Sequence, residues 1–327
     1  MEPVDPTLVS MRVRRAKELG FTPDHLRSQL WEHSAHGIVR PTYFVVDHTA
    51  ARISDAVALM SDLNTLGGWA SLNIQGNQWF DGSDSSRGER AVLVHCWPGS
   101  QLRLRPGIRP SEGLVLPDEV ISLERYSVTS LARAAYDEMR LARNLREAVV
   151  VLDMATSTTS SVAHTSPTAV ARVVASHHKT RGIVQARRAL SLGNPRSASP
   201  WETRTRLVAQ LDADILDLRV NAPVFDLNEN LLGVADLIDP QTGLVIESDG
   251  GDHREAARHT DDNVREEKFE RAGAVVCRVT SLDHRDKRTM VGRMVAAKRD
   301  AQHSTRKLWT LDQPDWWRPW PPARRWD

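Results

Sequence analysis

The sequence predicts a protein of mixed α/β class, α+β overall, with an N-terminal helical unit, a mixed middle segment and a C-terminal α/β domain. Three observations predict it. The 327 residues suffice for two or three domains at about 150 residues each. Two helix patterns followed by a β-prone run open the chain. In the last third, two β-prone runs flank a turn that contains Pro and Gly, as in a hairpin.

Composition places the chain among ordinary globular proteins, with 40% hydrophobic and 26% charged residues. No apolar run approaches the roughly 20 residues that span a bilayer, and the first ten residues lack the basic-then-apolar pattern of a signal peptide. We therefore expect a cytoplasmic protein without a membrane partner. The net charge of +1 neither favours nor excludes nucleic acid. Cys96 and Cys277 are too few for a Cys-rich zinc site.

The first predicted domain, residues 1–48, contains two helices and a β segment. One helix runs from Leu8 to Leu19 and stops at a glycine. A second runs from Asp24 to about Ser34, after a Thr-Pro pair suited to an N-cap and first turn. A β-prone run follows from Ile38. Two helices, a Gly-containing turn and a β wing are typical of a winged helix-turn-helix.

This region resembles the N-terminal DNA-binding domain of AbiEi-type antitoxins, through Gly37, Arg40 and Tyr43 in a G-x-x-R-x-x-Y pattern. The resemblance implies DNA as a partner, with Arg27 and Arg40 as DNA-binding residues. It also implies a cognate toxin or a phage-defence component as a further partner. A helical cap without DNA contact is the alternative interpretation.

Residues 49–194 form the predicted mixed α/β middle domain. We expect a helix from Ala50 to Leu66, strands over 91–97 and 102–105, and an amphipathic helix capped by Thr129 or Ser130. The segment 128–133 matches the V-T-S-x-A-R segment of AbiEi-like proteins from actinobacteria. The break Gly193-Asn194-Pro195 marks the start of the last domain.

The chemistry-bearing residues lie in the third predicted domain, residues 195–305. If Pro240 to Gly243 form the loop of a hairpin, Asp239 faces Leu244, and counting back sets Asp236 opposite Glu247 on one face. A one-residue slip would separate the two acids. Two adjacent carboxylates raise each other's pKa, and a hard divalent cation such as Mg²⁺ relieves that penalty. The sequence therefore predicts a metal site at Asp236 and Glu247.

This domain resembles the very-short-patch-repair-like endonucleases of the PD-(D/E)XK superfamily, and so predicts a restriction-endonuclease-like fold. The matching residues are Ser199-Pro200-x-Glu202-x-Arg204, Asp236, Val245-Ile246-Glu247-x-Asp249-Gly250, His253, Asp262, Arg265, Gly273 and Arg278. The resemblance implies a magnesium- or manganese-dependent deoxyribonuclease in which Asp236 and Glu247 bind the metal. Glu202 would approach from the first helix of the domain, as a further ligand or as an acidic group behind the ligands.

The sequence departs from the family pattern at Asp249, which stands where the wider class has lysine. His253, Arg265 or Lys268 would then supply the missing function, and Arg265 and Lys268 are also expected to contact DNA. Each of these residues has a plainer interpretation. Asp249 and Gly250 could form a turn, His253 could be structural, and Arg265 and Lys268 could lie on a solvated helix face.

Two functions follow from these patterns. The first is a metal-dependent DNA endonuclease, which the intact acids favour. The alternative is a non-catalytic DNA-binding regulator of AbiEi-antitoxin type, which the missing lysine favours. The sequence leaves open the DNA sequence recognised, the biological pathway and the oligomeric state. It also leaves open the role of the tail 306–327, which holds five of the ten tryptophans and either docks on the protein or stacks on bases or a partner.

Overall fold

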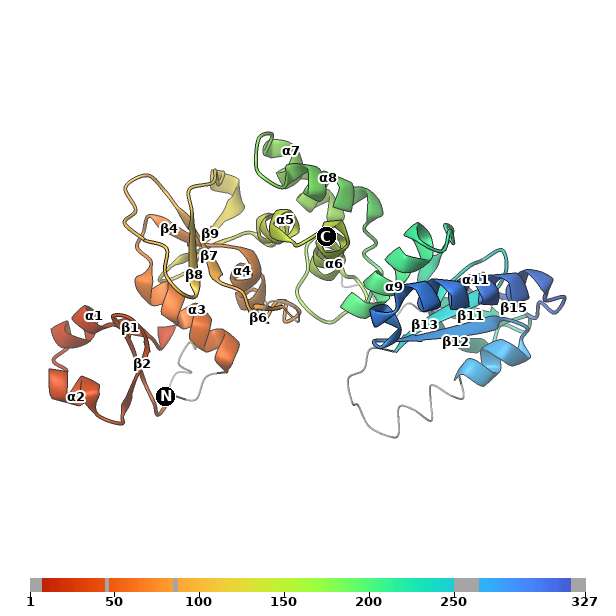
Figure 1. The fold of residues 1–327 in the computed structure, drawn as a ribbon, viewed down its shortest axis with the longest axis horizontal. Helices are drawn as coiled ribbons and strands as arrows, with labels where there is room; N and C mark the ends of the chain where they lie inside the picture. Colours follow the sequence, from red (N-terminus) through yellow and green to blue (C-terminus); the bar gives the residue numbers. More distant parts are fainter. Residues whose placement is uncertain (1–7, 45–46, 85–87, 250–264, 319–327) are drawn as a thin grey trace. The chain divides into compact units, whose positions relative to one another are not determined.

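The computed structural model describes residues 8–44, 47–84, 88–249 and 265–318 (Figure 1). The chain forms two compact units. The first comprises Met1–Leu141 and Thr168–Arg187, and the second comprises Ala142–Pro167 and Arg188–Asp327. Both contain helices and sheets, which confirms the mixed α/β class. Among the described residues, no helix has the length and apolar character needed to cross a membrane.

The first unit opens with a small three-stranded sheet of order β1-β3-β2. Its elements are β1 (Met11–Arg12), α1 (Val13–Glu18), α2 (Pro23–Arg27), β2 (Trp31–Ala35) and β3 (Ile38–Pro41). The second helix was predicted to reach Ser34, and this was wrong: α2 ends at Arg27. Trp31 instead begins β2, where its ring packs edge-on against Phe21 at 4.8 Å and joins the apolar cluster around Leu26. Burying this ring in the cluster outweighs local helix propensity.

The larger part of the first unit is a five-stranded sheet of order β8-β7-β4-β10-β9 with helices around it. Its elements are α3 (His48–Leu59), β4 (Asn64–Leu66), α4 (Gly68–Ile74), β7 (Val92–Cys96), β8 (Ile108–Ser111), β9 (Val120–Ser122), β10 (Ser127–Thr129), α5 (Leu131–Leu141) and α7 (Pro167–Ser176). A two-stranded ribbon of β5 (Ser83–Asp84) and β6 (Gly88–Glu89) and the short 3₁₀ turn Pro117–Glu119 complete it.

Two local predictions in this region were wrong. The helix expected from Ala50 to Leu66 ends at Leu59, because Asn64–Leu66 pairs with both β7 and β10 inside the sheet. Residues 102–105 form no strand; only Arg105 makes an isolated bridge, to Ile108. The predicted cap of α5 is present, since Ser130 Oγ accepts a hydrogen bond from the Arg133 backbone N–H at 3.3 Å.

A buried charge network ties α5 to the sheet of the first unit. Asp137 accepts hydrogen bonds from His95 Nε2 at 2.7 Å, Arg133 Nε at 3.2 Å and Arg140 Nε at 3.1 Å. Arg133 also donates to Glu119, which pairs with His177. Burial would raise the pKa of Asp137, but the surrounding positive groups outweigh it and hold that pKa well below its usual range. The network therefore stabilises the fold when Asp137 is ionised.

The second unit is a five-stranded mixed sheet of order β14-β13-β12-β11-β15 with helices on both faces. Its elements are α6 (Leu145–Thr156), α8 (Ile183–Leu192, which begins in the first unit), α9 (Pro200–Leu211), β11 (Arg219–Asp226), β12 (Leu231–Ile238), β13 (Leu244–Asp249), a helix over 265–271, β14 (Val275–Thr280), the 3₁₀ turn Asp283–Arg285, α11 (Lys287–His303) and β15 (Trp309–Thr310). Neighbouring strands are antiparallel except for β13 and β14, which are parallel.

Each face of this sheet has its own core. Val208 of α9 and Met290 and Met294 of α11 pack with Leu237 and Ile246 on one side. Phe269, from the helix 265–271, packs with other strand residues on the opposite side. The described part of the tail docks on the same unit: Trp309 is buried, and Trp316 and Trp317 contact Phe225 edge-on. Trp309 therefore extends the core at the β11–β15 edge of the sheet, while Trp316 stays largely exposed.

Candidate functional site

The β12–β13 hairpin places the predicted acids, and its turn sets the register. Asp239 closes the turn by accepting hydrogen bonds from the Gln241 N–H at 2.9 Å and from Thr242 Oγ1 at 2.9 Å. Gly243 has φ of +79°, a conformation that favours glycine, and a Cβ there would lie 2.7 Å from the Trp309 ring. The pairing is Leu237 with Ile246 and Ile238 with Val245. The predicted register is confirmed.

Continuing that register by one residue sets Asp236 opposite Glu247. The Asp236 carboxylate accepts a hydrogen bond from the Ser248 backbone N–H at 2.8 Å. Burial raises the pKa of Asp236 well above its ordinary value, and the negative charges of Glu247 and Glu202 raise it further. The Ser248 N–H and the positive charge of Arg265 oppose this shift only in part. Burial beside two other acids therefore favours the protonated form of Asp236.

A row of polar residues crosses the sheet at this point. Asn221 of β11 lies opposite Asp236 by continuation of the pairs Val220–Leu237 and Ala222–Ala235. On the other side, Glu247 pairs with Arg278 of β14. Asn221 has φ of +45°, and Val220 and Ala222 on either side of it belong to different apolar clusters. The backbone at Asn221 therefore breaks the regular alternation of strand β11 beside the acids.

Glu202 approaches the acids from the first turn of α9. Ser199 caps this helix by accepting from the Glu202 N–H at 3.2 Å. The Glu202 carboxylate in turn accepts from the Ala198 N–H at 2.8 Å and from Asn221 Nδ2 at 2.6 Å. Burial raises the pKa of Glu202, and these donors lower it. Asn221 thus connects Glu202 to the strand that lies beside Asp236.

Arg265 is the basic neighbour of the acid pair and lies on the helix whose Phe269 packs against Val245 and Ile238. Its guanidinium contacts Glu247 Oε2 at 2.6 Å, and its side chain is 34% exposed. The approach depends on Gly233 of β12, where a Cβ would lie 2.7 Å from Arg265 Cγ and 3.1 Å from Phe269 Cζ. The helix 265–271 therefore lies close enough to the sheet to set a positive charge on Glu247. Any cation bound by Glu247 competes with this guanidinium.

The remaining predicted site residues are placed differently. Asp249 is exposed at the end of β13 and pairs with Thr280. Lys268 is exposed on the helix 265–271. Arg40 is only 11% exposed and contacts Glu32 and Asp55, while Arg27 is 71% exposed beside Asp24. His253 lies outside the described residues.

Sequence reasoning missed the residues that support the acids. Asn221 lies in β11, a strand that no local pattern predicted, and its role depends on contacts with Glu202 and with the Arg196 carbonyl at 2.7 Å. The hydroxyl of Thr205 lies 3.0 Å from that of Ser248 and 3.2 Å from His284 Nε2. Asn, Thr and Ser are common in loops and strands, so their identity alone carried no signal.

The donor set suits a hard divalent cation, because Asp236 and Glu247 offer carboxylate oxygens from neighbouring strands. Burial raises the pKa of Asp236 most, and the charges of Glu247 and Glu202 raise it further; a bound cation would offset the repulsion among these carboxylates. Within the described ranges, no group of three or more His, Cys, Asp or Glu side chains is placed to hold a metal ion. The fit therefore rests on these two acids, with further ligands supplied by water, DNA or another part of the chain.

Comparisons with protein-family models, with curated proteins and with solved structures found no match in any of the three.

Proposed function

We propose that the second unit is a metal-dependent DNA endonuclease of the very-short-patch-repair-like, PD-(D/E)XK type. The observation that carries the proposal is the juxtaposition of Asp236 and Glu247 across the β12–β13 hairpin, with the Asp236 pKa raised by burial and by its acidic neighbours. Acids on adjacent strands are the feature that this class needs. Glu202, held by Asn221, adds a third carboxylate near the pair.

In this function Asp236 and Glu247 hold Mg²⁺ or Mn²⁺. An ion of this kind polarises a phosphodiester and lowers the pKa of an attacking water. Asn221 holds the Glu202 carboxylate, whose charge acts on Asp236, and the Ser248 N–H fixes one Asp236 oxygen. Without DNA, Arg265 pairs with Glu247. When DNA binds, the Arg265 guanidinium can contact a phosphate instead.

A second function, a non-catalytic DNA-binding regulator of AbiEi-antitoxin type, is favoured by a different observation. Arg265 already supplies a positive charge to Glu247, and Asp249 stands exposed where the nuclease class has lysine. In a regulator, the ion pair would be a permanent structural contact. The N-terminal part of the first unit would bind an operator.

Plasmid cleavage separates the two functions. Full-length protein is incubated with supercoiled plasmid and Mg²⁺, Mn²⁺ or EDTA, beside Asp236→Asn and Glu247→Gln. Asp300→Asn, an exposed acid on α11, is the matched control. The endonuclease predicts metal-dependent nicking or linearisation that falls on the order of 100-fold in the two site variants and is unchanged in the control. Equal cleavage by all proteins would indicate a contaminant, and no cleavage by any would favour the regulator.

A further inference from the structure

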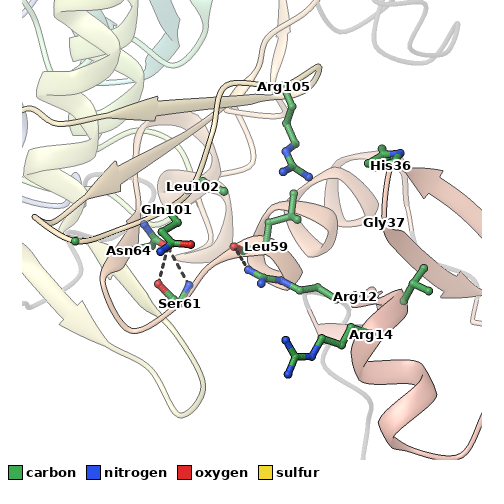
Figure 2. Close-up of a pocket in the computed structure, with 12 residues that line it drawn as sticks. Arg12, Arg14, His36, Gly37, Leu59, Ser61, Asn64, Gln101, Leu102 and Arg105 are labelled. Atoms are coloured by element: carbon green, nitrogen blue, oxygen red, sulfur yellow. Dashed lines mark hydrogen bonds between the residues drawn. The ribbon is translucent and has the colours of Figure 1, made fainter.

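A basic hollow of about 680 Å³ lies in the first unit, away from the acids described above (Figure 2). Four chain segments line it: the β1–α1 junction, the turn between β2 and β3, the segment 59–64 that leads into β4, and the segment 99–105 that follows β7. The lining residues used below are Arg12, Arg14, His36, Asn64, Gln101 and Arg105.

All the ionisable side chains that line this hollow are basic. Arg12, Arg14, Arg105 and His36 contribute, and no Asp or Glu lines the hollow. Figure 2 shows Arg105 extending toward the hollow from the top of the view and Arg12 from the right, with the Arg12 guanidinium at the Leu59 carbonyl. Among the described residues, neither forms an ion pair with a carboxylate within 4.0 Å. Their charge is therefore available to an external anion.

Arg12 is held in place before any ligand arrives. Its Nε donates to the Ala58 carbonyl at 3.0 Å and its terminal nitrogen to the Leu59 carbonyl at 2.5 Å. These carbonyls belong to the last turn of α3, whose negative dipole end favours a cation. A guanidinium has five N–H groups, so two bonds to carbonyls leave donors for an anion.

Arg14 is a highly exposed member of the set. Its side chain is 90% exposed and its contact with Glu18, at 3.1 Å, is a surface pair within one helix. Such pairs contribute little and exchange readily for another anion. Exposed Arg103 lies on the loop that carries Arg105, and exposed Arg109 lies in β8, which follows that loop. Exposed Arg15 and Lys17 lie on α1 beside Arg14. The basic surface thus continues beyond the rim of the hollow.

We propose that this hollow binds the sugar–phosphate backbone of double-stranded DNA. The hollow has four basic side chains from three segments, which is more than a single phosphate group needs. A DNA backbone, in contrast, presents several phosphates in a row. The lining contains no Phe, Tyr or Trp ring on which a nucleobase could stack, which points to the backbone rather than to base edges. The proposal does not depend on nuclease activity in the second unit.

The test is fluorescence anisotropy with the full chain in EDTA, using a labelled DNA duplex of arbitrary sequence over a range of NaCl concentrations. The test variant is Arg14→Ala/Arg105→Ala. Arg125→Ala, an exposed arginine of the first unit outside the hollow, is the matched control. Arg27→Ala tests the helix α2 surface separately. Circular dichroism and Tm establish that each variant is folded.

The double variant is expected to weaken binding by about 10-fold or more at low salt and to reduce the slope of log K against log salt by about 2. The affinity of Arg125→Ala for the duplex should stay within about two-fold of the parent's, because one exposed charge outside the site contributes little. Unchanged affinity and slope in the double variant would overturn the proposal, as would a loss confined to Arg27→Ala.

Competition separates DNA from other anions. Millimolar inorganic phosphate should leave the duplex bound, because one phosphate cannot replace several contacts. Displacement by inorganic phosphate would show a single-anion site, and displacement by poly-glutamate at equal charge concentration would show a site for an acidic protein segment. Either result would overturn the assignment to DNA.

Discussion

Asp236 and Glu247 face each other across neighbouring antiparallel strands, one residue beyond the pair Leu237–Ile246. Asp236 is also bonded to the backbone N–H of the residue after Glu247. The two carboxylates are thus held together by backbone geometry rather than by side-chain freedom. Their mutual repulsion lowers the stability of the folded state, and the dependence of stability on pH measures this effect.

The first prediction concerns pH and Asp236→Asn. The folded-state pKa of Asp236 is raised above the ordinary 3.8, so folding favours its protonated form. The associated stability is present below pH 3.8 and is lost as pH rises through the folded-state pKa. In EDTA at neutral pH, Asp236→Asn should therefore be more stable than the parent by on the order of 1 kcal/mol, since Asn still accepts the Ser248 N–H.

The measurement is Tm in EDTA across the acidic to neutral range for both proteins. Other buried acids shape the parent curve, so the difference between the two curves is the quantity to examine. Parallel curves would contradict a raised Asp236 pKa.

The second prediction concerns Arg265→Gln. Removing the guanidinium frees Glu247 Oε2 for a cation, so binding of Mn²⁺ should tighten several-fold. In EDTA the same variant should be less stable, because the acid pair loses its opposing charge. Isothermal titration calorimetry with Mn²⁺ gives the first result and thermal denaturation the second. Arg271→Gln, which removes an exposed pair on the same helix, is the control. Absence of Mn²⁺ binding to both parent and Arg265→Gln would remove the support for a metal site.

The third prediction concerns Gly233→Ala. The added Cβ meets Arg265 Cγ at 2.7 Å and Phe269 Cζ at 3.1 Å, so the helix 265–271 must shift away from the sheet. We expect a loss of about 1–3 kcal/mol, as for other overpacked sites. Gly292→Ala is a matched control, because nothing lies within 4 Å of its Cβ position on α11 and alanine is the better helix former. That variant should gain about 0.5–1 kcal/mol. Equal effects of the two substitutions in urea denaturation would show that the close approach at Gly233 is unimportant.

The fourth prediction concerns the buried network of the first unit. Asp137→Ala leaves Arg133, Arg140 and His95 without their shared acceptor, and should cost about 3–5 kcal/mol. The folded-state pKa of Asp137 is lowered, so its contribution is present above pH 3.8 and is lost as pH falls toward the folded-state value. The stability difference between the parent and Asp137→Ala, followed by urea denaturation, should shrink on acidification.

Asp118→Ala, an exposed acid of the same unit, should change stability little at any pH. A loss at Asp137 that is constant with pH would indicate a packing defect rather than loss of a charge network.

Local sequence patterns predicted the structure correctly where the contacts that determine it join residues close in sequence. The turn residues from Asp239 to Gly243 fixed the hairpin register and with it the Asp236–Glu247 pair. The start of α5 at the Ser130 cap follows from the same kind of short-range hydrogen bond.

Local sequence patterns predicted the wrong secondary structure where contacts with residues distant in sequence determine it. Trp31 continues an apolar helical pattern, yet its contact with Phe21 and the apolar cluster requires a strand. Asn64–Leu66 extends the pattern of α3 but is a central strand, because β7 and β10 flank it. Strand β11 was missed, and Asn221 with it.

By itself, then, the sequence determined the mixed α/β class and the pairing of two acids, because a short turn and the two-residue period of a strand carry that information along the chain. Only the tertiary structure decided that Arg265 neutralises Glu247, that Asn221 holds Glu202, that Arg40 pairs with Glu32 and Asp55, and that three basic segments meet in one hollow. Each of these relationships joins residues from separate elements, and their distance is set by how helices and sheets pack.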